Sequence, residues 1–204
     1  MSLILNHVYH TYGEGTTLQV HALQDICLTI NDGDFITVIG GNGAGKSTLL
    51  KTLVGKLNPI SGEYTYGTDV EWGYFDQQEA LEVVGNPKQT VIDNFWEEYP
   101  TLMQQEVRKA LGNFLFSQDE VFKELGQLSG GEKVRLALCK MFKKRPNLLI
   151  LDEPTNHMDI VGKETLEWML KKYTGTVLFV SHDRYFISQV ATALLVFEED
   201  NVTL

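Results

Sequence analysis

The chain has 204 residues, 43% of them hydrophobic and 22% charged, which is ordinary for a globular protein that buries a sizeable core. The formal net charge of −10 argues against a broad basic surface for nucleic acid. The longest apolar runs are too short to cross a bilayer and no secretory signal pattern is present, so we expect a cytoplasmic protein.

The first part of the chain predicts strands followed by one helix. Three stretches rich in branched and aromatic residues, separated by Gly and Asp turns, predict strands: residues 3–12, 22–30 and 34–40. A loop and a helix are predicted next, over residues 41–55, because leucines recur there at helical spacing. Two further short strands are predicted at residues 61–67 and 69–78.

The middle of the chain is helical and polar, with candidate helices at residues 90–99 and 101–116. A third helix is predicted over residues 133–145, where three basic residues in the last turn offset the helix dipole. The unalternated apolar runs 147–151 and 176–180 then predict parallel strands that are covered on both faces. With the helix predicted between them, they form a strand–helix–strand unit, which indicates the α/β class.

The cysteines and histidines indicate no metal site. Cys27 and Cys139 lie in apolar stretches without a CxxC motif, so we expect buried thiols in a reducing compartment. His7, His10 and His21 are interpreted as ordinary strand or loop residues.

The clearest chemical motif is GGNGAGKST, which matches G-x-x-x-x-G-K-[ST] between a predicted strand and a predicted helix. Its glycines let backbone N–H groups point at phosphate oxygens, and the helix N-terminus adds positive potential. Lys46 would reach the β- and γ-phosphates, and the Ser47 hydroxyl would bind Mg²⁺. The candidate phosphate-binding residues are Gly41, Asn42, Gly43, Ala44, Gly45, Lys46, Ser47 and Thr48.

Two adjacent acids, Asp152 and Glu153, end the apolar run before them. Acids at strand ends are common on solvated surfaces, so the pair alone is ambiguous. A nucleotide bound at the glycine-rich loop, however, needs a second Mg²⁺ ligand and a group that orients the attacking water. Asp152 suits the first role and Glu153 the second.

Three weaker sequence features also favour a nucleotide site. LSGGE places Ser129, Gly130 and Gly131 at a helix N-terminus, which is a second anion site. His182 follows a buried strand, where it could contact a γ-phosphate. Gln77 ends a predicted strand, and its neutral amide could bind both Mg²⁺ and water.

The order of these motifs resembles the ATP-binding-cassette (ABC) ATPases over nearly the full chain. The resemblance implies a P-loop fold with a mainly parallel sheet, flanking helices, an N-terminal antiparallel part and a helical subdomain at about 85–128 within one domain, 1–204. It implies ATP and Mg²⁺ as ligands and Tyr12 as the aromatic that stacks on adenine. It also implies a head-to-tail dimer, in which LSGGE closes over the partner's nucleotide and Asp159 lies at the interface.

From about residue 60 onward, DEPTNHMD and FVSHDRYFI resemble the second cassette of ABC-F proteins, which implies a possible ribosome contact. The N-terminal part, including Gly41, is more similar to a transporter cassette, with a join near residues 57–62. An engineered chimera, an excised domain and a divergent natural protein all fit this pattern. For function, an ABC-F-like ATPase is preferred, with a transporter's nucleotide-binding subunit and a binding module of little turnover as the alternatives.

Overall fold

The computed structural model describes residues 2–82, 86–117, 119–198 and 202–203. The chain divides into two compact units. Unit 1 contains residues 1–74, 146–153 and 174–204, and unit 2 contains residues 75–145 and 154–173. The helical subdomain expected at about 85–128 falls within unit 2, which also includes helices on either side of that range.

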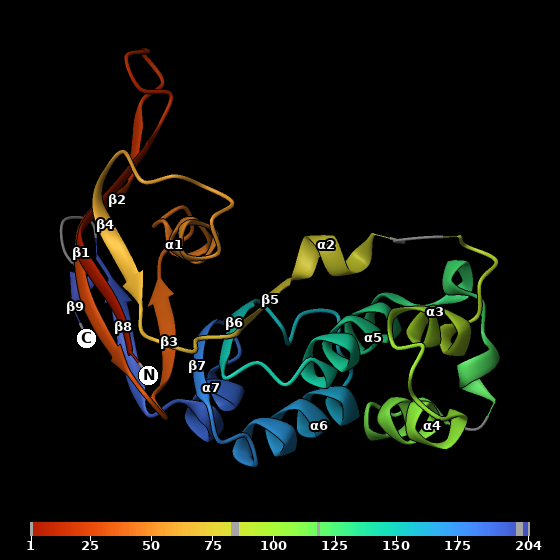
Figure 1. Cartoon of the computed structure of the whole chain (residues 1–204). Helices are drawn as coiled ribbons and strands as arrows, with labels where there is room; N and C mark the ends of the chain where they lie inside the picture. The colour runs from red at the N-terminus through yellow and green to blue at the C-terminus, as the bar shows by residue number, and fades with distance from the viewer. Residues whose placement is uncertain (1, 83–85, 118, 199–201, 204) are drawn as a thin grey trace. The chain divides into compact units, whose positions relative to one another are not determined.

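Unit 1 carries an antiparallel sheet and most of a second, mainly parallel sheet (Figure 1). The antiparallel sheet has the strand order β2-β1-β4, and the larger sheet has the order β5-β6-β7-β3-β8-β9. The strands are β1 (Ser2–Tyr12), β2 (Val20–Asn31), β3 (Phe35–Gly40), β4 (Ser61–Tyr66), β5 (Trp72–Asp76), β6 (Leu148–Asp152), β7 (Thr176–Val180), β8 (Ala193–Phe197) and β9 (Val202–Thr203). These two sheets confirm the predicted α/β class with an antiparallel N-terminal part.

The central strands explain why their sequences lack alternation. Every residue of β6 and of β7 is buried, and β3 pairs in parallel with both β7 and β8. Helix α1 (Lys46–Leu53) follows β3 and buries Leu49, Leu50 and Leu53 in the core of unit 1. The core therefore holds the start of α1 firmly against the strands that precede and flank it.

Unit 2 is helical, as its polar and periodic sequence predicts. Its helices are α2 (Gln77–Leu81), α3 (Val91–Glu98), α4 (Gln104–Asn113), α5 (Gly130–Lys143) and α6 (Ile160–Lys171), with short 3₁₀ turns η1 (Glu120–Phe122) and η2 (Leu125–Gln127). Among the described residues, no helix is both long and apolar enough to cross a membrane.

The structure also differs from the sequence-based expectations. Helix α7 (Arg184–Val190) and strand β8 were not among the predicted elements, although β8 completes the parallel pairing of β3. Gln77 does not end a strand: β5 stops at Asp76, whose side chain caps α2. Cys27 is exposed, so the prediction of a buried thiol is wrong for this residue and correct for Cys139.

Candidate active site

The glycine-rich loop between β3 and α1 is shaped by glycines in conformations that other residues avoid. Gly43 and Gly45 have positive φ values of 79° and 95°. A Cβ atom on Gly45 would lie 1.9 Å from the carbonyl oxygen of Ala22, so only glycine fits there. Helix α1 begins after Gly45 without a side-chain cap, which leaves its first N–H groups available to an anion.

Lys46 lies against this loop. Its Nζ donates to the carbonyl oxygens of Gly40 and Gly41 at 2.8 and 2.7 Å, and the residue is only 8% exposed. Burial lowers the pKa of Lys46, while the charges of Glu153 and Asp152 oppose that shift. The loop therefore holds a largely desolvated cation beside its own backbone.

A hydrogen bond joins the loop to the predicted acidic strand end. The hydroxyl of Ser47 donates to Oδ1 of Asp152 at 3.1 Å, although the two residues are 105 positions apart in the sequence. A hydroxyl and a carboxylate oxygen are hard ligands of the kind that Mg²⁺ prefers. The two residues therefore fit a Mg²⁺ ion, as the sequence predicts.

Glu153 directly follows β6 in a strained conformation, with φ of 51°. Its Oε1 lies 3.3 Å from Nε2 of His182, whereas its Oε2 is buried without a hydrogen-bond partner. Burial raises the pKa of the Glu153 carboxyl; the charge of Asp152 also raises it, and His182 lowers it. An unpaired buried carboxylate oxygen is costly unless a ligand or water completes it, so Glu153 fits the role of a base that orients water.

His182 and Tyr12 also reach this part of unit 1. Asp183, directly after His182, caps α7 by accepting from the backbone N–H of Phe186, and so fixes the turn that carries the imidazole. The hydroxyl of Tyr12 lies 3.2 Å from Oγ1 of Thr48 in the first turn of α1. The aromatic ring predicted for adenine therefore lies beside the phosphate loop.

Unit 2 contains the remaining predicted site residues. Gln77 is the first residue of α2, and its Oε1 accepts a hydrogen bond from Nδ2 of Asn156 at 3.0 Å. The sequence analysis did not single out Asn156, although it lies within the quoted motif DEPTNHMD. Asp159 caps α6 by accepting from the backbone N–H of Gly162.

The LSGGE motif forms the N-terminus of α5. Ser129 and Glu132 make a reciprocal capping box, in which the Ser129 hydroxyl accepts from the Glu132 N–H. A Cβ atom on Gly131 would lie 2.8 Å from the carbonyl oxygen of His157, so this glycine allows two backbone segments to approach. The structure thus places Ser129, Gly130 and Gly131 at the start of a 14-residue helix, as predicted.

Residues 23–156 match the family model described as "ABC transporter". A search of curated proteins finds the putative ATP-binding protein YdiF of Bacillus subtilis, 49% identical over 88% of this chain, and the ATP-binding protein Uup of Escherichia coli K12, 41% identical over 88%. ABC transporter F family member 5 of Arabidopsis thaliana is 43% identical over 84%. The chain spans 28%, 30% and 25% of the length of these three relatives.

Solved structures have the same fold. The dimeric structure of MJ0796, a bacterial ABC transporter cassette, matches with a TM-score of 0.80 and 25% identity, covering 99% of this chain and 97% of that one. A post-hydrolysis dimer of the same cassette, bound to ADP and phosphate, matches with a TM-score of 0.78 and 22% identity over 99% and 97% of the two chains. The predicted cassette architecture is therefore confirmed.

Proposed function

Because this chain belongs to the ABC transporter family, we propose that it is an ATPase domain of ABC-F character. It binds ATP with Mg²⁺ and hydrolyses ATP to ADP and phosphate. It works as a pair of cassettes, in which each nucleotide is held between two of them.

The hydrogen bond from Ser47 to Asp152 is the observation that carries this proposal. It brings the phosphate loop together with the acidic end of β6, and the buried, unpaired Oε2 of Glu153 belongs to the very next residue. An ordinary solvated strand end needs neither the contact nor the desolvation. A site for a metal-bridged polyphosphate and its attacking water needs both.

The residues of unit 1 have distinct roles in this proposal. Backbone N–H groups of the loop and the ammonium of Lys46 bind the phosphates, and Tyr12 stacks on adenine. Ser47 and Asp152 hold Mg²⁺, which when bound offsets the negative charge that develops on the transferred phosphoryl group. Glu153 orients the attacking water and takes up its proton, while His182 contacts the γ-phosphate.

Unit 2 supplies the remaining roles. Gln77 is proposed to bind Mg²⁺ and the attacking water from within its own cassette. Ser129, Gly130 and Gly131 are proposed to bind the γ-phosphate held by the partner, because the positive potential of a helix N-terminus suits an anion. One nucleotide does not need two anion sites on the same chain, which favours completion of each site by a second cassette.

The proposed partner is a second copy of this chain or another cassette of similar sequence. The similarity to ABC-F relatives adds a ribosome contact and a cytoplasmic location to the proposal, and makes a membrane partner the weaker alternative. The MJ0796 cassette is dimeric in its solved structure, which supports the paired arrangement by analogy.

Replacing Glu153 with Gln tests the proposed reaction. The parent chain should hydrolyse ATP, and Glu153→Gln should lower the rate constant by about 10²–10⁴ while still binding ATP, because the amide cannot accept the water's proton. Glu164→Gln, an exposed substitution on α6, is the control and should hydrolyse ATP at the parent rate. A Glu153→Gln protein as active as the parent, or a parent that binds ATP without turnover, would contradict the proposal.

A further inference from the structure

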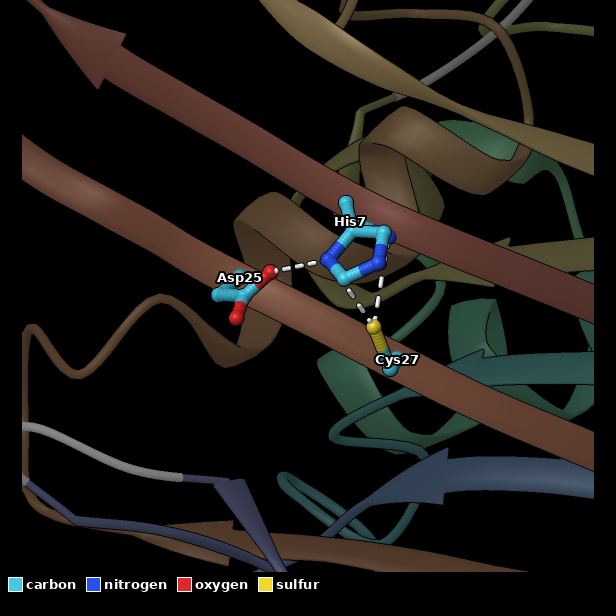
Figure 2. Close-up of side chains that lie close together, drawn as sticks. All are labelled: His7, Asp25 and Cys27. Atoms are coloured by element: carbon cyan, nitrogen blue, oxygen red, sulfur yellow. Dashed lines mark hydrogen bonds and ion pairs between the residues drawn. The ribbon is translucent and has the colours of Figure 1, made fainter.

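Outside the proposed nucleotide site, three metal-ligating side chains meet on the exposed face of the antiparallel sheet. We call His7, Asp25 and Cys27 the β1–β2 cluster. Nδ1 of His7 lies 2.6 Å from Oδ1 of Asp25 and 3.5 Å from Sγ of Cys27, and one ligand atom from each residue lies within 4.8 Å of the other two. Figure 2 shows His7 on one strand facing Asp25 and Cys27 on the neighbouring strand.

Irregularities in the strand pairing bring these side chains together. The register between β1 and β2 shifts between Leu5 and Val8 and again between Val8 and His10, so both strands contain residues outside the regular ladder. His7 and Asp25 lie in these interruptions with φ values of 50° and 52°. If the register at Leu5 continued without a shift, His7 would pair with Ile26, and residues 25 and 27 would lie on the opposite face of the sheet. The cluster therefore depends on the bulged pairing.

We propose that the β1–β2 cluster binds one Zn²⁺ ion. The ligands are Nδ1 of His7, a carboxylate oxygen of Asp25 and the thiolate of Cys27, with water as the fourth ligand. This combination of nitrogen, oxygen and sulfur is typical of zinc, whereas Mg²⁺ prefers oxygen alone. The cluster would therefore select a metal different from the one proposed for Ser47 and Asp152.

One distance within the cluster already suits a tetrahedral ion. Bonds of about 2.0–2.3 Å from zinc to nitrogen, oxygen and sulfur place neighbouring ligand atoms about 3.2–3.7 Å apart. The distance of 3.5 Å from His7 Nδ1 to Cys27 Sγ already lies in that range, and the carboxylate of Asp25 would rotate outward from its 2.6 Å hydrogen bond. All three residues are exposed, so an ion can enter from solvent.

Zinc binding at the cluster releases one proton, from Cys27, and shifts another within His7. The thiol of Cys27 loses its proton to solvent as the thiolate binds, and the neutral imidazole of His7 carries its proton on Nε2 instead of Nδ1. An ordinary aspartate carboxyl is already ionised at neutral pH, so Asp25 has no proton to lose when the ion binds. No oxidant or other reactant is needed.

Titration of the whole chain with Zn²⁺, in excess Mg²⁺ and in competition with a chromophoric chelator, tests the proposal. The parent should bind one Zn²⁺ per chain, and Cys27→Ser should weaken binding at least tenfold. His7→Asn and Asp25→Asn should do the same. Asparagine tolerates the left-handed backbone of these two positions, so loss of binding would not reflect lost folding.

Two matched controls keep the result specific. Cys139→Ser removes the buried cysteine of unit 2, and His21→Asn removes an exposed histidine of β2 that lies outside the cluster. Both should bind Zn²⁺ as the parent does. Co²⁺ in place of Zn²⁺ should give a thiolate charge-transfer absorption that Cys27→Ser lacks. Equal Zn²⁺ affinity in the parent and Cys27→Ser, or loss of binding in either control, would overturn the proposal.

Discussion

At the residue scale, the ammonium of Lys46 is surrounded by oxygen atoms of the chain itself. Two of them are the carbonyl oxygens of Gly40 and Gly41, and the acidic charges of Asp152 and Glu153 act on it as well. Exchanging these neutral acceptors for charged phosphate oxygens is favourable, because most of the side chain is already shielded from solvent. The buried lysine is thus prepared for an anion rather than for the protein core.

Lys46→Ala should weaken ATP binding by about 10- to 100-fold, the usual effect of losing a charged hydrogen bond. The fold should be retained, since no apolar contact depends on the ammonium group. The measurement is a nucleotide titration of the folded variant, with Lys56→Ala as the control because Lys56 is exposed just after α1. Unchanged ATP affinity in Lys46→Ala would show that the loop is not the nucleotide site.

Glu153 combines burial with an unpaired oxygen, so its charge should destabilise the folded chain. Its pKa is raised on folding, mainly by burial, and the folded state therefore binds more protons than the unfolded state once the pH exceeds the usual glutamate pKa, near 4.5. Stability is then lost as the pH rises through the window between the unfolded and folded pKa values.

Glu153→Gln removes this loss of folding stability with rising pH, because the amide does not ionise. The variant should melt at a higher temperature than the parent at neutral pH, and the difference should shrink as the pH falls toward the usual glutamate pKa. Thermal unfolding of both proteins across that range measures the effect. A melting temperature that is lower than the parent's at neutral pH would contradict the proposed desolvation of Glu153.

At the scale of elements, the junction of β3 and α1 depends on backbone space. Gly45→Ala should place a methyl group 1.9 Å from the Ala22 carbonyl oxygen, so the loop or β2 must move. We expect a loss of roughly 3 kcal/mol or more in unfolding free energy, together with weak ATP binding.

Gly55→Ala is the matched control for this substitution. Gly55 also has a positive φ, 74°, but no atom lies near its built Cβ, so only the backbone term of about 1 kcal/mol should appear. Denaturant unfolding of both variants measures the difference. Equal losses would show that the close approach of β2 to Gly45 does not constrain the loop.

The same elements show how far the sequence was informative. The unalternated runs of β6 and β7 predicted buried parallel strands correctly, because burial on both faces removes alternation. Cys27 was misjudged although local sequence carried the signal, because it lies between the buried residues Ile26 and Leu28 and the alternation of β2 puts it on the exposed face. The contact of Asn156 with Gln77, by contrast, joins distant parts of the chain and could not be read from local sequence.

At the scale of the whole molecule, the proposed site residues are distributed over both compact units. The phosphate loop, Asp152 and Glu153 belong to unit 1, whereas Gln77 and Ser129 belong to unit 2. The roles assigned to individual residues stay predictions, and the most consequential one is that Ser129 serves the nucleotide of another cassette. A head-to-tail pair makes two such composite sites, so mixing two differently inactivated variants tests the arrangement directly.

The decisive measurement is the ATPase rate of a mixture of two variants, Lys46→Ala and Ser129→Arg. Each should be nearly inactive alone, because the first lacks a working loop and the second blocks LSGGE with a bulky side chain. In a mixed pair, the loop of the Ser129→Arg chain meets the intact LSGGE of the Lys46→Ala chain. An equal mixture should therefore recover about one quarter of the parent rate, since half of random pairs are mixed and each has one complete site of two. A mixture no more active than its separate components would contradict completion of the site by a second cassette.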